Sequence, residues 1–209
     1  MKKIMFNDKY GLTQAVLEGR KTMTRRIVPK CKELDILRIW EHNEGAIATG
    51  YEGNTHSFRF DYCPDKKRRI SIDHLNLIPS YKVGEVVAVA QKYKDTWGNP
   101  DFLFGDKPGW SNKMFVAADL MPHQIRITNI RVERLQDISE EDCSREGIYK
   151  KTLCPPGDID YFYHSEPRSK WEVYPSAREA FAGLIDKVSG KGTWVSNPWV
   201  FVYEFELAR

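Results

Sequence analysis

Apolar and polar residues follow two periods along the chain, one typical of short helices and one typical of strands. Residues 10–18 carry apolar side chains at helical spacing, and Gly19 directly after them is a common type of helix end. Residues 22–26 alternate in character, so we expect a strand that begins as soon as this helix ends. The N-terminal part therefore predicts a helix, a turn and a strand.

The middle and the end of the chain predict further strands, because short apolar or alternating runs are separated by turn-forming residues. In the closing run, Trp199, Phe201 and Tyr203 fall on one face of a strand together with Phe205. Core packing is the expected role of Trp194 and Trp199. Strands are expected at residues 36–40, 46–51, 57–62, 85–90, 125–133 and 198–205, with a hairpin turn at 52–55.

Two later helices carry their own start signals. Ser139 and Asp142 have the spacing of a capping box, and Gly147 ends the helix that they begin. Ser176 and Glu179 form a second capping box. The apolar residues behind this second box form one helical stripe, which predicts a helix packed on the core. The stripe consists of Ala177, Ala180, Phe181, Leu184, Ile185 and Val188.

Many short strands and few helices favour an α+β fold with a small, partly open β-barrel and peripheral helices over a doubly wound parallel sheet. The chain has 209 residues, with 41% hydrophobic and 29% charged residues, which is typical of one folded globular domain, residues 1–209. Residues 33–80 predict a β-rich insertion. Residues 148–171 lack usable periodicity and predict a long loop over the barrel.

The sequence contains no apolar run long enough to span a membrane, and its first residues do not have the pattern of a signal peptide. We therefore expect a cytoplasmic protein without a membrane partner. Its four cysteines are scattered and form no C-x-x-C pair, so they predict reduced thiols rather than a zinc site. The histidines show no ligand spacing either, and no metal or cofactor is expected.

Charge is unevenly distributed, although the formal net charge is only +3. Residues 19–32 contain six lysines and arginines and no acid, whereas residues 137–146 contain five acids against Arg145. A second basic cluster, residues 66–69, is explained by a solvated loop. The acid-free run predicts that one end of the molecule attracts phosphate, so RNA is the expected partner.

The acid-free run also carries a motif. Residues 17–26, Leu-Glu-Gly-Arg-Lys-Thr-Met-Thr-Arg-Arg, resemble the G-x-K-x-x-x-x-R signature of the ASCH family. Residues 83–85, 132–142, 180–181 and 197–200 are similar, in the same order, to the longer members that are often associated with prophages. The resemblance implies a single PUA-like barrel domain with insertions at about 33–80 and 148–172. It also implies a cleft that is lined by the signature and receives RNA or a modified nucleoside.

Some ASCH proteins are similar to the bacterial N(4)-acetylcytidine amidohydrolase, in which a Lys, a Thr and a later Glu perform the chemistry. The resemblance places the first two at Lys21 and Thr24, and an ungapped count places the third at Arg126. A guanidinium cannot replace a carboxylate. Longer members also carry an Arg-Glu pair where this chain has Ala90 and Gln91. The remaining candidates for the acid are Glu85 and Glu133.

Two principal functions follow. The leading expectation is a binding module for RNA or a nucleoside, which uses Arg20, Lys21, Thr24, Arg25, Arg26 and Arg126. The alternative is an amidohydrolase for an acylated nucleoside, in which Lys21 acts as base and Thr24 as nucleophile. A carboxylate within hydrogen-bond reach of Lys21 or Thr24 distinguishes them, because hydrolysis needs a proton shuttle and binding does not. A third possibility, an interaction protein of phage origin, requires these basic side chains to be splayed into solvent.

Overall fold

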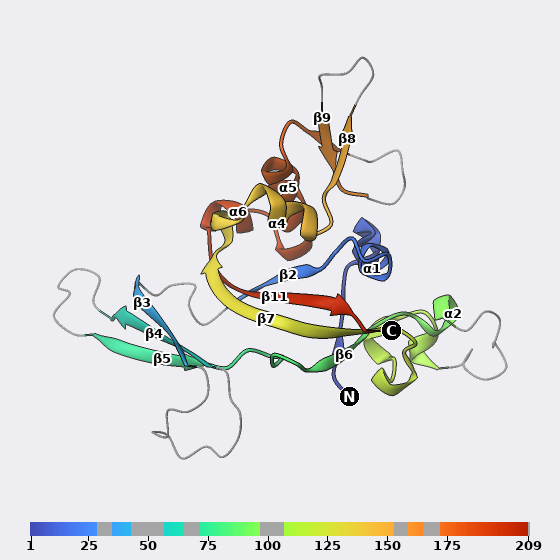
Figure 1. Ribbon diagram of the computed structural model, residues 1–209, viewed down its shortest axis with the longest axis horizontal. Coiled ribbons are helices and arrows are strands. Elements are labelled where there is room, and N and C mark those ends of the chain that lie inside the picture. Colours follow the sequence, from blue (N-terminus) through green and yellow to red (C-terminus); the bar gives the residue numbers. More distant parts are fainter. Residues whose placement is uncertain are drawn as a thin grey trace.

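A five-stranded mixed sheet forms the centre of the computed structural model, which describes residues 1–28, 35–42, 57–64, 72–96, 107–152, 159–164 and 172–208 (Figure 1). The strand order is β1-β6-β7-β11-β2, in which only the β1 and β6 pair is parallel. The strands are β1 (Lys3–Ile4), β6 (Val86–Val89), β7 (Gln124–Arg134), β11 (Trp199–Leu207) and β2 (Met23–Ile27).

Strand β11 is an inner strand of this sheet and lies between β7 and the edge strand β2. Its residues 200–203 are all buried, because side chains on both faces of the strand are covered. The predicted aromatic face therefore accounts for only part of the buried surface of this strand, since the other face is covered as well. A shift in register between Glu204 and Phe205 also interrupts the alternation along the strand.

The helices are short except for one. They are α1 (Leu12–Leu17), α2 (Tyr93–Thr96), α4 (Glu140–Arg145), α5 (Ala177–Ser189) and α6 (Thr193–Ser196). Figure 1 shows α4, α5 and α6 grouped on one side of β7 and β11. Helix α2 and the 3-10 turns of residues 108–120 lie at the end of the molecule opposite the strands of residues 35–42, 57–63 and 73–77.

Helix α5 confirms the predicted capped helix. The Ser176 hydroxyl accepts a hydrogen bond from the Glu179 backbone N–H at 3.1 Å, which satisfies one of the free donors of the first turn. The predicted apolar stripe is buried from Ala177 to Ile185, but Val188 near the helix end is 39% exposed. Trp194 and Trp199 pack against the core cluster, as predicted.

Two smaller antiparallel sheets complete the described fold. The first has the order β3-β4-β5 and consists of β3 (Asp35–His42), β4 (Ser57–Cys63) and β5 (Asp73–Leu77). Strand β4 thus pairs with β3 and β5, whereas the predicted strand 46–51 and its turn lie outside the described residues. The basic cluster 66–69 also lies outside them.

The second small sheet corrects the prediction of a loop over residues 148–171. Its order is β10-β9-β8, from β8 (Tyr149–Thr152), β9 (Ile159–Phe162) and β10 (Val173–Tyr174). Residues 150–152 are exposed and Tyr149 is half-buried, so β8 buries too little apolar surface to produce an alternating pattern.

The α+β class is confirmed. Among the described strands the large sheet is open, with β1 and β2 at its two edges, so a PUA-like barrel stays a prediction. No described helix is long and apolar enough to cross a membrane. Cys143 is a free, buried thiol, and within the described ranges no cluster of three metal-ligating side chains occurs.

Candidate functional site

A cavity of about 280 Å³ lies at the β2 edge of the large sheet. The segment that follows β1 and the inner face of α5 form its apolar walls, which include Phe6, Phe181 and Leu184. Its polar wall comes from the signature segment and from the end of α4. The polar residues are Lys21, Thr24, Arg25, Arg26 and Glu146, and we call this space the Lys21 cavity.

The end of α1 places Lys21 in this cavity. Gly19 adopts φ of 71°, a left-handed conformation that a glycine tolerates well, and the chain turns back so that the Lys21 N–H donates to the Ala15 carbonyl at 2.9 Å. The Lys21 side chain is only 2% exposed. Its ammonium nitrogen therefore depends on protein partners.

Glu146 supplies those partners. Lys21 Nζ donates to Glu146 Oε2 at 2.5 Å and to the Glu146 backbone carbonyl at 2.8 Å. Glu146 follows α4, and Gly147 after it has φ of 103°, so the chain turns sharply where this carboxylate enters the cavity. A Cβ at Gly147 would lie at ordinary contact distance from Leu12 and Lys21, so the positive φ rather than lack of space favours a glycine here.

Burial lowers the pKa of Lys21 below its ordinary value, although the adjacent carboxylate of Glu146 acts in the opposite direction. The positive charges of Arg26 and Arg25 lower this pKa further. A lysine in such surroundings gives up its proton more readily than a lysine in water, as a general base must.

Arg25 is buried among three carboxylates. Its guanidinium donates to Glu133 at 2.7 Å, to Asp142 at 2.9 Å and to Glu146 at 3.0 Å. Burial alone would lower the pKa of Arg25, but these three carboxylates raise it above its ordinary value. Arg25 is thus fully engaged, which argues against its predicted role as a phosphate ligand.

The carboxylates around Arg25 belong to a larger network. Arg131 contacts Glu133, Asp142 and Glu204, and Arg145 contacts Glu204 at 2.8 Å. Four cations meet four carboxylates in this network, so its formal charges balance. The members are Lys21, Arg25, Arg131 and Arg145 with Glu133, Asp142, Glu146 and Glu204.

Thr24 and Arg26 are the other signature residues of the Lys21 cavity. Thr24 is 6% exposed, and its hydroxyl has no hydrogen-bond partner among the residues that the structure describes. Arg26 is exposed and donates to the Met5 carbonyl at 2.7 Å, with its guanidinium 6.0 Å from the ring centre of Phe6. A hydroxyl and an accessible cation therefore remain available to a ligand.

The other predicted site residues do not line this cavity. Arg20 lies over the ring of Tyr149, 4.0 Å from its centre, and pairs with Glu18. Arg126 is half exposed on β7, 3.9 Å from Glu206. Of the two candidate acids, Glu85 pairs with Lys2 at 3.1 Å and Glu133 binds Arg25.

The structure thus brings Lys21, Thr24, Arg25 and Arg26 together and adds Glu146, which the sequence interpretation did not name. Glu146 ends the acid-rich run 137–146, and the glycine after it marks a helix end. Those two signals indicate a carboxylate at a turn, but they do not indicate that it contacts Lys21, 125 positions earlier.

Comparisons with known proteins add no relative: no protein-family model, no curated protein and no solved structure matches the chain.

Proposed function

We propose that the protein is an amidohydrolase that acts on an acylated nucleoside, with Lys21, Thr24 and Glu146 as the reacting residues. The observation that carries this proposal is the 2.5 Å contact between Lys21 Nζ and a Glu146 carboxylate oxygen in the cavity that Thr24 lines. A proton shuttle beside the signature lysine is the feature that separates hydrolysis from mere binding.

In the proposed reaction, the Lys21 ammonium passes one proton to Glu146, and the neutral amine accepts the Thr24 hydroxyl proton while Thr24 Oγ1 attacks the acyl carbon. The new O–C bond forms, the C–N bond breaks, and the protonated Glu146 gives its proton to the leaving nitrogen, which restores the ion pair. Water then attacks the acyl ester on Thr24 with the same proton path in reverse. The products are the free amine and a carboxylic acid, and the Thr24 hydroxyl is restored.

The nucleoside class rests on cavity size and on the ASCH resemblance. At about 280 Å³ the cavity lies near the small end of ligand pockets, which span about 300–1,000 Å³, so it suits one nucleoside rather than a folded partner. The rings of Phe6 and Phe181 offer apolar contact to a base. We further propose that the open sheet belongs to a small, partly open PUA-like barrel, because the signature strand β2 borders the cavity at the sheet edge.

A binding module for RNA or a nucleoside is the second candidate. The exposed guanidinium of Arg26 beside the Phe6 ring favours it, since a cation and an aromatic ring are a common pair for holding a phosphate and a base. In that case the contact between Lys21 and Glu146 is structural only.

Turnover of N(4)-acetylcytidine to cytidine, measured by chromatography, tests the proposal. We expect Lys21→Met and Thr24→Val to lower the rate by roughly 100-fold to 10,000-fold, because each removes a group that acts in the transition state. Thr22→Val is the matched control, since Thr22 binds Arg145 and does not line the cavity. Absence of wild-type turnover together with binding of the nucleoside would favour the binding module.

A further inference from the structure

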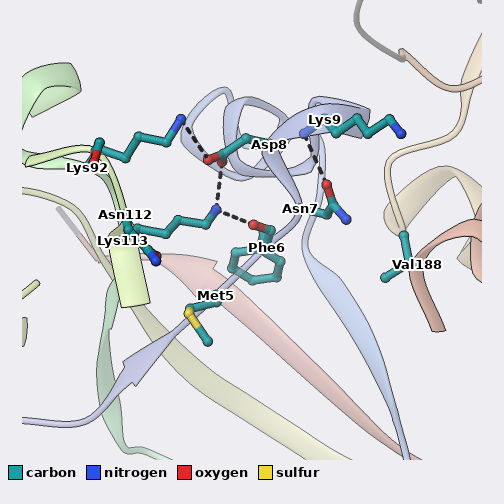
Figure 2. Close-up of a pocket in the computed structure, with 10 residues that line it drawn as sticks. Met5, Phe6, Asn7, Asp8, Lys9, Lys92, Asn112, Lys113 and Val188 are labelled. Carbon is teal, nitrogen blue, oxygen red and sulfur yellow. Dashed lines mark hydrogen bonds and ion pairs between the residues drawn. The ribbon is translucent and has the colours of Figure 1, made fainter. Parts of the chain in front are cut away.

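A second cavity, of about 440 Å³, adjoins the Lys21 cavity. Met5, Phe6, Asn7 and Val188 line both spaces, so they meet along the segment after β1. Figure 2 shows this second space with its lysines drawn. We call it the lysine groove, after Lys9, Lys92 and Lys113.

The lysine groove carries a surplus of positive charge. Three lysines line it against a single acid, Asp8, which leaves two positive charges in excess. Lys113 neutralises Asp8 directly, with Nζ 2.6 Å from Asp8 Oδ1 and 3.1 Å from Thr13 Oγ1. Lys113 also donates to the Phe6 carbonyl, so all of its donors are engaged.

Lys92 and Lys9 have donors to spare. Lys92 Nζ lies 3.6 Å from Asp8 and 3.9 Å from Asp95, both beyond hydrogen-bond length. Lys9 forms no ion pair with any residue in the described ranges, and its Nζ lies 5.6 Å from the ring centre of Tyr10. In Figure 2 the Lys92 and Lys113 side chains point toward Asp8, whereas Lys9 extends away from it.

These observations match the chemistry of a phosphate group. A phosphate offers several acceptor oxygens and one or two negative charges, and lysine ammonium groups bind it as point charges. The hydroxyl of Ser111 and the amide of Asn112 add polar groups at the same wall. The Lys21 cavity differs, because its buried cations are balanced by carboxylates.

We propose that the lysine groove binds the phosphate of a nucleotide whose acylated base occupies the Lys21 cavity. This inference rests on the proposed function and makes its substrate a nucleoside phosphate, either a free nucleotide or a nucleotide within an RNA strand. One sugar joins a base to its phosphate, so a single nucleotide spans two cavities that share a wall. The phosphate contacts position the base and leave its identity to the Lys21 cavity.

Isothermal titration calorimetry with cytidine and with its 5′- and 3′-monophosphates tests the inference independently of turnover. For the wild type we expect one monophosphate to bind on the order of tenfold more tightly than cytidine, and the preference to weaken with added salt. Lys9→Ala combined with Lys92→Ala should abolish the preference. Lys150→Ala with Lys151→Ala, on β8 and away from both cavities, should keep it.

Equal affinity for cytidine and both monophosphates, a preference that survives the Lys9 and Lys92 changes, or no binding at all would overturn the inference. A preference that depends on these lysines in a protein without turnover would keep the phosphate site and remove the proposed hydrolysis. Turnover of N(4)-acetylcytidine without any phosphate preference would keep the proposed hydrolysis and remove the phosphate site. A cytidine-containing trinucleotide that binds more tightly than either monophosphate would identify RNA as the source of the phosphate.

Discussion

Neighbouring residues of β2 have different surroundings in the fold, although in the sequence they belong to one basic run. Arg25 is buried in a charge-balanced network with Glu133, Asp142 and Glu146. Thr24 and Arg26 offer their polar groups to the Lys21 cavity. The Thr24 hydroxyl has no hydrogen-bond partner among the described residues, and the Arg26 guanidinium is exposed. A run of cations in a sequence therefore does not measure how much positive charge a ligand can reach, because carboxylates distant in the chain can neutralise part of it.

The largest expected effect comes from removing Arg25 from the charged network. Arg25→Ala should lower the free energy of unfolding by about 3–5 kcal/mol, because it leaves buried carboxylates without their shared partner. Arg26→Ala should change it by no more than about 0.5 kcal/mol, as for other exposed positions. Urea denaturation followed by circular dichroism measures both, and equal losses would contradict the distinction between the two arginines.

A smaller loss of stability is expected when the apolar wall of the Lys21 cavity is changed. Leu184 of α5 lines the Lys21 cavity yet is 3% exposed, so Leu184→Ala should cost about 2–5 kcal/mol of stability. Val188 lines the same cavity near its rim and is 39% exposed. Val188→Ala should cost clearly less in the same denaturation experiment. A similar cost for both changes would mean that the helix face is not packed as described.

The smallest expected effect is a dependence of stability on pH through Glu204. Burial alone raises the pKa of Glu204, but hydrogen bonds from Arg145 and Asn129 and the charges of Arg145 and Arg131 lower it below its ordinary value of 4.5. The folded state therefore binds this proton less readily than the unfolded state. This contribution to stability is present above pH 4.5 and is lost as the pH falls toward the folded pKa.

Thermal melts of wild type and Glu204→Gln between pH 3 and 7 measure this contribution, in about half-unit steps. The wild type should lose more stability on acidification than Glu204→Gln does. Parallel curves for the two proteins would show that the pKa of Glu204 is the same in the folded and unfolded states.

Local signals in the sequence predicted α1, α4 and α5, whereas the one-turn helices α2 and α6 were not predicted. The Ser139 and Ser176 caps lie where expected, because a capping box involves residues only three positions apart. The strands β2, β6, β7 and β11 were also predicted, since an apolar run or a two-residue alternation marks each of them. Strands β8 and β9 were missed, because their side chains are exposed or half-buried and do not produce a clear hydrophobic period.

The site was predicted only in part, for a physical reason. Alternation along residues 22–26 places Thr24 and Arg25 on opposite faces of the strand, but it does not indicate what covers each face. The partners of Arg25 are more than 100 positions away in the sequence. Glu146 was missed for the same reason, whereas Lys21 and Thr24 were named because the ASCH resemblance places them in the signature segment.

The most direct test of the central claim, that Glu146 is the acid beside Lys21, is the initial rate of cytidine release from N(4)-acetylcytidine by three proteins. We expect Glu146→Gln to be slower than wild type by roughly 100-fold to 10,000-fold, since it removes the proton shuttle and keeps the side-chain shape. Glu85→Gln, which changes an acid outside the cavity, should match wild type. Wild-type activity in a folded Glu146→Gln protein, or loss of activity in Glu85→Gln instead, would contradict the account.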